Sequence, residues 1–533
     1  MKRPAIIALL LLLLQTACGT PYGLWGVYFT PTPEQSPLPP AIITTTAEPS
    51  IPPSPPPPTS TPVSDPLPAS ASPAPTVVIA PTSTIAPEVA PILYYTQSGD
   101  TLPALAKRFN VAPNEISASQ PLPEKGLIDP GTLLVIPNRI GEATTPNVHL
   151  LPDSEIVFSA TSAGFDIAGY IQKSGGYLKT YREYLSTGGW TDSPQIITRL
   201  AYENSINPRL LLAVLEYESH WVRSQPLDDL HLDFPLGFQD YRYKNLFMQM
   251  VWAINQISTA YYGWRTGNLT ELTFNDGTHL RIEPQLNAGT VAIQYLFSRL
   301  HSQAQWSRII DPDSGFPALY AEMFGDPWTR ADRVTQIFPA GIRQPPLALP
   351  FEVNIPWSYT GGPHGAWEHD GALAAIDFAP SSDHTGCVES NAWVTASAAG
   401  LVVRSENGIV VLDLDGDNHE ETGWNLLYLH IASKDRVQKG VWVEANEPIG
   451  HPSCEGGVAT GTHVHFARKY NGEWVIADGP LPFNLSGWTV VAGEKPYEGL
   501  LIKGNRTIIA DPLGRSWSVI IREPDGTPTP VRP

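Results

Sequence analysis

Residues 461–466 read GTHVHF and place two histidines one residue apart among β-branched neighbours. Side chains alternate between the two faces of a β-strand, so His463 and His465 would share one face, and Thr462 and Val464 the other. Two imidazoles on one side of a sheet can serve one metal ion or one reacting group. They can equally be a pair of exposed strand residues, and the spacing alone favours neither interpretation.

The sequence around this pair predicts a mostly antiparallel β-domain. Runs such as AWVTASAAGLVVRSENGIVVLDLDGD (392–417), WNLLYLHI (424–431) and THVHFARKY (462–470) combine strand-forming residues with turns at short intervals. This alternation is typical of antiparallel sheets. We place the β-domain at residues 346–490 and treat residues 491–533 as a C-terminal extension.

Upstream of the pair lie residues that complete a zinc site. The segment YTGGPHGAWEHDGALAAIDFAP (359–380) supplies His364 and Asp377, and YLH (428–430) supplies His430. A catalytic zinc takes three nitrogen or oxygen ligands from the protein and one water, which His364, Asp377 and His465 would satisfy. Such a metal lowers the pKa of its water and polarises a carbonyl, so an amide can be hydrolysed without a serine or cysteine nucleophile. His430 and His463 would then orient the water or stabilise the oxyanion.

This set of residues resembles the lysostaphin/LytM-type zinc endopeptidases, which cut the peptides of peptidoglycan. The family pattern is a first histidine, an Asp-Phe pair, a Tyr-x-His and a final His-x-His, and all four appear here in that order. His364 is the last residue of a GGPH motif, and twelve residues separate it from Asp377. Both features are similar to the LasA-like branch of the family. The resemblance implies one Zn²⁺, with His364 as a ligand and His369 in an insertion loop. It covers about residues 350–485.

The N-terminus is typical of an export signal over residues 1–17. Lys2 and Arg3 precede a short apolar run, and QTAC ends at Cys18. A cysteine at this place resembles a bacterial lipobox and implies a lipid anchor. Gln15 departs from that pattern, and an ordinary secretory signal is the alternative. Residues 18–91 are rich in Pro, Ser and Thr, and we expect a disordered stalk.

Residues 92–138 predict a small βααβ module. A Tyr-Tyr strand is followed by the turn SGDT (98–101), helical periodicity, and a closing strand in PGTLLVIP (130–137). The pattern resembles a LysM module, which implies binding of glycans that contain N-acetylglucosamine. Asp100 could contact the sugar or serve only as a structural cap.

Residues 150–345 are predicted to be α-helical. Asn207-Pro208 is a helix start, and Glu218-Ser219 follows an apolar stretch. NPRLLLAVLEYESHW (207–221) resembles the catalytic helix of lytic transglycosylases and goose-type lysozymes, which implies Glu218 as general acid. The cleft-lining Gly-Leu-Met-Gln segment of those families is absent. A lysozyme-like scaffold that binds glycan, or only spaces the domains, is therefore the preferred interpretation.

Two further features lie in the β-domain. Cys387 and Cys454 are the only cysteines after Cys18, and export permits a disulfide between them. Asp413, Asp415 and Asp417 could hold Ca²⁺, although Trp424 stands where an EF-hand loop has its bidentate glutamate. A solvated hairpin turn accounts for the three aspartates more simply.

The sequence therefore predicts a multidomain, extracytoplasmic zinc endopeptidase that acts on peptidoglycan and is lipid-anchored or secreted. The net charge of −19 argues against nucleic acid as the main partner. Two alternatives remain: a transglycosylase that uses Glu218, and a non-catalytic regulator that binds the cell wall. The products released from peptidoglycan would distinguish the three.

Overall fold

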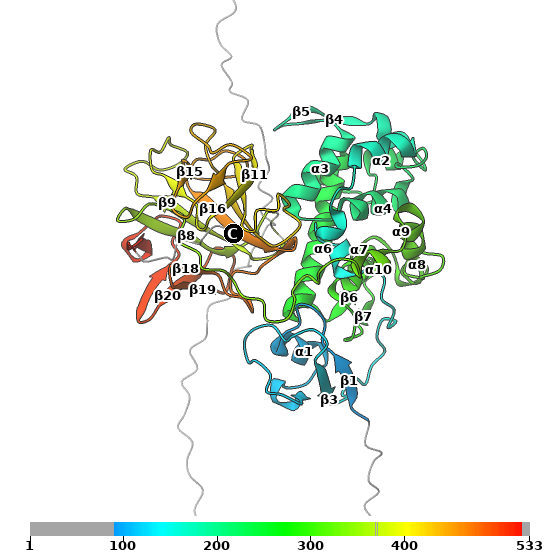
Figure 1. The fold of residues 1–533 in the computed structure, drawn as a ribbon. Helices are drawn as coiled ribbons and strands as arrows, with labels where there is room; N and C mark the ends of the chain where they lie inside the picture. Colours follow the sequence, from blue (N-terminus) through cyan, green and yellow to red (C-terminus); the bar gives the residue numbers. More distant parts are fainter. Residues whose placement is uncertain (1–89, 368, 370, 525–533) are drawn as a thin grey trace, which may run out of the picture. The chain divides into compact units, whose positions relative to one another are not determined.

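The computed structural model describes residues 90–367, 369 and 371–524 (Figure 1). The predicted signal sequence, Cys18 and almost all of the Pro-rich stalk lie outside these residues. Among the helices of the described part, none is long and apolar enough to cross a membrane. Helices and mostly antiparallel sheets make up the described chain, as the sequence predicts.

The module at residues 92–136 forms a three-stranded antiparallel sheet with helices beside it. Its elements are β1 (Ile92–Tyr95), α1 (Leu102–Arg108), η1 (Pro113–Glu115), β2 (Ser117–Ala118) and β3 (Leu133–Ile136), with sheet order β1-β3-β2. The second predicted helix is a single 3₁₀ turn that begins at Pro113. Asp100 is buried and accepts hydrogen bonds from Tyr94 Oη at 2.7 Å and Arg108 Nη1 at 2.8 Å. Asp100 therefore holds the SGDT turn in place rather than facing solvent.

The following region is built of helices, with two short hairpins between them. The helices are α2 (Ile167–Ser174), α3 (Ser193–Asn204), α4 (Pro208–Ser219), α5 (Leu230–Asp233), α6 (Asn245–Thr266), α7 (Ala288–Leu300), α8 (Gln303–Ile309), α9 (Phe316–Phe324) and α10 (Pro327–Ala331). The hairpins are β4 (Arg182–Leu185) with β5 (Gly189–Asp192), and β6 (Glu271–Thr273) with β7 (His279–Arg281). Helix α4 begins where predicted, because the Asn207 side chain accepts from Arg209 N and Pro208 needs no hydrogen-bond acceptor.

The C-terminal region contains a nine-stranded antiparallel sheet with order β14-β11-β12-β13-β16-β9-β8-β22, and β17 pairs with β16. The strands are β8 (Pro356–His364), β9 (Ala375–Pro380), β11 (Gly400–Glu406), β12 (Ile409–Asp413), β13 (Trp424–Leu429), β14 (Trp442–Val443), β16 (Val464–Tyr470), β17 (Glu473–Trp474) and β22 (Val519–Ile521). Smaller sheets are β10 (Val394–Thr395) with β15 (Pro448–Gly450), and β18 (Asn484–Leu485), β19 (Trp488–Ala492), β20 (Gly499–Lys503) and β21 (Arg506–Ile509).

The residues expected to be a C-terminal extension take part in this sheet. Strand β22 pairs with β8, the strand that ends at His364. Residues beyond 490 therefore form one edge of the sheet. Alternating residues separate the two faces of the central strands: Ile376, Phe378 and Phe466 pack in one apolar core. Asp377 and His465 therefore point to the opposite face, where the candidate site lies.

Candidate metal centre

The register of the central strands brings Asp377 and His465 together. His465 lies opposite Asp377 across β16 and β9, and opposite Leu429 across β16 and β13. Both side chains are almost fully buried. The sequence spacing of 88 residues between them is closed by direct strand pairing, which fixes their positions with main-chain hydrogen bonds.

His364 reaches the same place from the end of β8, which pairs with β9. The preceding glycines make room for it. A Cβ on Gly361 would lie 2.5 Å from Asp377 Oδ2, and a Cβ on Gly362 would lie 2.3 Å from Glu498 O. The GGPH motif is therefore a steric requirement, because a side chain at Gly361 would displace the Asp377 carboxylate.

Three electron-rich atoms face one another at the centre of this group. His364 Nε2 lies 3.0 Å from His465 Nδ1, and Asp377 Oδ1 lies 3.3 Å from the first atom and 3.4 Å from the second. The other ring nitrogens are held by backbone carbonyls: His364 Nδ1 by Gly362 O at 2.8 Å, and His465 Nε2 by Ala366 O at 3.0 Å.

Because a carbonyl only accepts, those bonds place the ring protons on the outer nitrogens of both imidazoles. Lone pairs then point inward from His364 and His465 toward the carboxylate. Asp377 Oδ1 is buried and has no hydrogen-bond partner of its own. Such an arrangement calls for a cation, and one oxygen with two imidazole nitrogens suits zinc.

The electrostatics of these groups agree with a demand for positive charge. Burial raises the pKa of Asp377, but the nearby imidazoles of His364 and His465 more than offset it and hold that pKa well below its usual range. Burial lowers the pKa of His364, yet Asp377 outweighs it and raises that pKa overall. The Asp377 carboxylate therefore favours a positive charge at this place.

His430 and His463 lie beside this group but are held differently. His463 precedes β16, and its Nε2 lies 3.8 Å from Asp377 Oδ1. His430 follows β13, and its ring centroid lies 4.5 Å from that of His463. Each has Nδ1 at 2.8 Å from a backbone carbonyl, of Glu455 for His430 and of Gly461 for His463. Each ring in its neutral form therefore presents Nε2 as a hydrogen-bond acceptor.

The pKa of His430 is lowered to about 3, chiefly by burial and also by His463 and His465. His430 is therefore neutral near pH 7. Its backbone adopts a positive φ of 65°, uncommon for a non-glycine residue. Ser453 N and Oγ both donate to His430 O, at 2.7 and 3.0 Å, and hold this conformation.

Tyr497 is a site residue that the sequence did not indicate. Its ring stacks on His364, with centroids 4.1 Å apart and planes 17° apart. Tyr497 N donates to Pro363 O at 3.1 Å, and Gly362 N donates to Tyr497 O at 2.8 Å. The residue lies in the segment between β19 and β20, and only the pairing of strands in space brings that segment beside the GGPH motif.

The structure contains a disulfide between Cys387 and Cys454, with Cα atoms 5.8 Å apart. It lies close to the segment that leads into His463. Thr462 Oγ1 donates to Val388 O at 2.6 Å and accepts from Val388 N at 2.9 Å. The disulfide and these hydrogen bonds join the segment at Cys387 and Val388 to the segment from Cys454 to Thr462, which precedes His463. His369 is exposed and is not part of the group formed by His364, Asp377 and His465.

Asp413, Asp415 and Asp417 also come together, in the turn between β12 and β13. Asp413 Oδ1 accepts from Asp415 N at 3.2 Å, and Oδ2 accepts from Asn418 N at 2.9 Å. Burial, together with Asp415, raises the pKa of Asp413 to about 7. Unlike Asp377, Asp413 has backbone partners for both oxygens, so the turn accounts for these carboxylates without Ca²⁺.

Glu218 lies near the C-terminal end of α4 and is paired with a histidine. Its Oε1 lies 2.9 Å from His301 Nε2, and both Glu218 and the adjacent Ser219 are buried. The ring of Tyr217, the preceding residue, packs against Phe297 and Phe316. Glu218, the possible general acid, is thus paired with His301, which connects α4 to the end of α7.

Comparisons with known proteins identify relatives for both the helical and the β-regions. Residues 149–338 match the family described as "LasA, N-terminal domain". Protease LasA of Pseudomonas aeruginosa is 26% identical over 359 residues, which cover 64% of this chain and 78% of that protein. Beta-lytic metalloendopeptidase of Achromobacter lyticus is 26% identical over 159 residues, 28% of this chain and 40% of that protein.

A solved structure described as the M23 metalloprotease pseudoalterin covers 34% of this chain and 99% of its own, with 22% identity. Its TM-score is 0.27. Of the named relatives, one is a protease and the other a metalloendopeptidase, and the His-Asp-His group lies in the region that the sequence pattern marks. The chain therefore carries a LytM-type zinc peptidase domain, and a region similar to the LasA N-terminal domain precedes it.

Proposed function

We propose that this protein is a zinc endopeptidase that hydrolyses peptide stems or cross-bridges of peptidoglycan outside the cytoplasm. One observation carries the proposal: two inward-facing imidazole lone pairs and the unpartnered Asp377 Oδ1 converge within 3.4 Å of one another. The names of the relatives, a protease and a metalloendopeptidase, support the same chemistry.

His364 Nε2, Asp377 Oδ1 and His465 Nδ1 would hold the metal. When bound, zinc polarises the scissile carbonyl and lowers the pKa of its water toward neutrality. The carbonyls of Gly362 and Ala366 fix the ring orientation of the two histidines, as outer partners of metal ligands do. Tyr497 covers one face of His364 and limits the directions from which solvent reaches that ligand.

His463 would move the proton, and His430 would help to orient the water. Because each Nδ1 donates to a carbonyl, each Nε2 can accept a hydrogen bond from the attacking water, and His463 can take the proton of that water and return it to the leaving amine. Donation to an oxyanion by His463, the role expected from the sequence, would require the doubly protonated ring. Burial keeps His430 neutral, and a pKa of about 3 makes it too weak a base to take that proton, so His430 would accept a hydrogen bond from the water and orient it.

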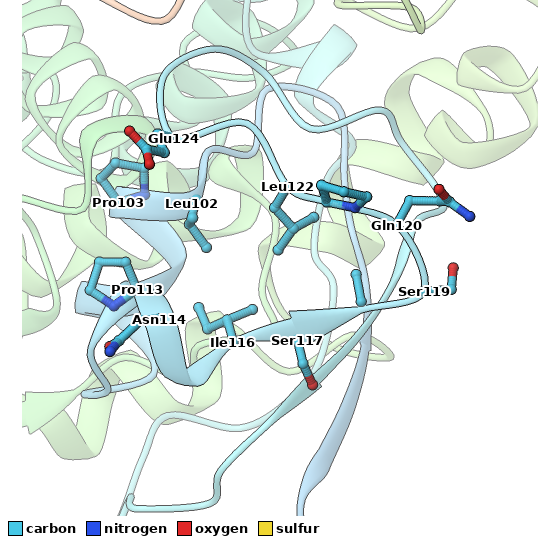
Figure 2. Close-up of a pocket in the computed structure, with 12 residues that line it drawn as sticks. Leu102, Pro103, Pro113, Asn114, Ile116, Ser117, Ser119, Gln120, Leu122 and Glu124 are labelled. Carbon is cyan, nitrogen blue, oxygen red and sulfur yellow. The ribbon is translucent and has the colours of Figure 1, made fainter.

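The N-terminal module would bind the glycan of the same polymer. A cavity of about 690 Å³ lies between the start of α1 and the segment after η1. Figure 2 shows residues that line it. Leu102, Ile116 and Leu122 give it an apolar floor, and Asn114, Ser117 and Gln120 add polar groups at its edge. An apolar hollow with a few polar groups suits a sugar ring. Binding here would raise the local concentration of peptide substrate.

Cys18 as a lipid anchor remains a prediction, because it lies outside the described residues. A lysozyme-like activity at Glu218 also remains a prediction. No observation favours it as a second function, since Glu218 is engaged with His301.

The products formed from purified peptidoglycan test the proposal. We expect the zinc-loaded full chain to release free amino groups and no anhydro-sugars. The Asp377→Ala variant, prepared alongside, should release neither. Anhydro-sugars from the wild type would support transglycosylase chemistry instead. A wild type that contains zinc but releases no amino groups would indicate a non-catalytic wall-binding protein.

A further inference from the structure

The hairpin β4–β5 of the helical region exposes two large aromatic side chains at one place. Tyr184 and Trp190 lie directly opposite each other in the strand register. The two residues are 67% and 66% exposed, and their ring centroids lie 6.1 Å apart with an angle of 80° between the ring planes. The guanidinium of Arg182 lies 5.1 Å from the Trp190 ring centroid. We call these three residues the aromatic patch.

The opposite face of the hairpin is anchored firmly. Leu185 is buried in the core of the helical region. Glu183 is also buried: its Oε2 accepts from Tyr181 Oη at 2.6 Å and from Phe247 N, near the start of α6, at 3.2 Å. Asp192 caps α3 through Gln195 N at 3.0 Å. The patch is therefore presented by a fixed support, which lowers the entropic cost of binding a ligand.

We propose that the aromatic patch binds the sugar rings of a glycan chain. The flat face of a pyranose carries C–H bonds of positive character, which match the negative face of an indole or phenol ring. Arg182 places hydrogen-bond donors beside the Trp190 ring, where hydroxyl and acetamido oxygens of the sugar would lie. The glycan as the ligand rests on the proposed function, because glycan is the polymer that carries the peptides to be cut.

The size of the patch argues against a protein partner or a second copy of this chain. A stable protein interface buries about 800 Å² on each side and uses roughly 20 to 30 residues. Here two aromatic rings and one guanidinium are bordered by the exposed polar residues Ser186, Thr187 and Asp192. One or two sugar rings match such a small surface, with polar groups at its rim.

The test uses peptide-free glycan strands, prepared from peptidoglycan, and the full-length chain. We expect Trp190→Ala and Tyr184→Ala each to weaken binding about three- to tenfold. Trp517→Ala is the matched control, because Trp517 is 48% exposed and lies 5.4 Å from the Arg515 guanidinium, yet belongs to the β-region. Unchanged affinity in Trp190→Ala, or an equal loss in Trp517→Ala, would overturn the proposal.

A local signal separates this patch from the cavity in Figure 2, which would bind the same strands. In protein labelled with 5-fluorotryptophan, the ¹⁹F resonance that disappears in Trp190→Phe belongs to Trp190. Glycan should shift that resonance and leave the Trp517 resonance in place. A Trp190 resonance that stays unshifted at saturating glycan would contradict the proposal.

Hydrolysis of a sugar-free peptide substrate serves as the independent readout of the zinc site. It should be the same in Trp190→Ala and in the wild type. If the wild type cleaves no peptide while glycan still shifts the Trp190 resonance, the proposed function fails and the glycan site stands. If peptide is cleaved and no glycan binds, the proposed function stands and the glycan site fails.

Discussion

Asp377 in the β-region and Glu218 in the helical region are both buried carboxylates; the sequence predicted the first as a metal ligand and left the second open as a possible general acid. Asp377 Oδ1 faces the imidazoles of His364, His463 and His465 at 3.3 to 3.8 Å and has no hydrogen-bond partner. Glu218 faces one imidazole, that of His301, at 2.9 Å. The Asp377 carboxylate has no positively charged partner in this group. Glu218 already has its partner in His301, with which it forms an ion pair or a hydrogen bond.

This difference separates a carboxylate that could hold a metal ion from one that already has a partner. A buried carboxylate is usually paired, because an unpaired charge costs several kcal/mol to bury. Glu218 meets that condition within its own helical region. Asp377 meets it only with a cation, since the neighbouring ring protons of His364 and His465 are already committed to backbone carbonyls. The following predictions test that contrast.

The largest effect is expected from removing a metal ligand. Asp377→Ala and His465→Ala should each lose zinc and lower peptide hydrolysis by more than about 100-fold, beyond the loss typical of an outer partner. His364→Ala should behave likewise, whereas His369→Ala should keep most of its activity and metal. Zinc content by atomic emission and amine release, measured on the same samples, would check this. Stoichiometric zinc in His465→Ala would refute the ligand assignment.

Removing either of the two histidines beside the metal group should spare the metal. His463→Ala and His430→Ala should keep near-stoichiometric zinc and lose about two to three orders of magnitude in turnover, typical of a single catalytic group. Zinc content and kcat, determined together, separate this result from ligand loss. If folded His463→Ala lacks zinc by the same assay, His463 is itself a ligand.

The disulfide should contribute to stability more than to chemistry. Its cysteines are 67 residues apart, and closing a loop of that length stabilises the folded state by about 4 kcal/mol in the chain-entropy account. Cys387→Ser/Cys454→Ser should therefore lower the free energy of unfolding by that amount, as measured in urea. A loss below about 1 kcal/mol would show that the bonds between Thr462 and Val388 hold the segment without it.

The smallest effect on activity is expected at Glu218. Glu218→Gln can keep a hydrogen bond to His301, so hydrolysis should stay within about twofold of the wild type and unfolding should change by less than about 2 kcal/mol. Activity assays and thermal unfolding would check both values. A large loss of peptide hydrolysis in a well-folded Glu218→Gln variant would mean that the two carboxylates are functionally linked.

Local sequence patterns predicted the elements that carry the site. Period-two alternation placed His463 and His465 on one face, and the order of the motifs grouped His364 and Asp377 with them. Proline at the first turn of α4 and the capping Asn207 were also recognisable. These features depend on neighbours in the chain, which a sequence displays directly.

Features that depend on pairing between distant segments were not predictable in the same way. Tyr497 and His364 are 133 positions apart in the sequence. They stack because β19 and β20, which flank Tyr497, lie against β8, which ends at His364. Strand β22 belongs to the sheet although it follows the β-domain expected from the sequence. The proton position on His430 depends on the carbonyl of Glu455, which lies 25 residues away in the chain and which the fold places beside the ring.

X-ray absorption at the zinc edge of the full-length protein tests the central claim most directly. The account predicts one zinc per chain, bound by two imidazole nitrogens, one carboxylate oxygen from Asp377 and one further oxygen from water. The account also predicts that Asp377→Ala loses this spectrum and that Glu218→Gln and His463→Ala keep it. A spectrum with three imidazoles, or one that persists unchanged in Asp377→Ala, would contradict it.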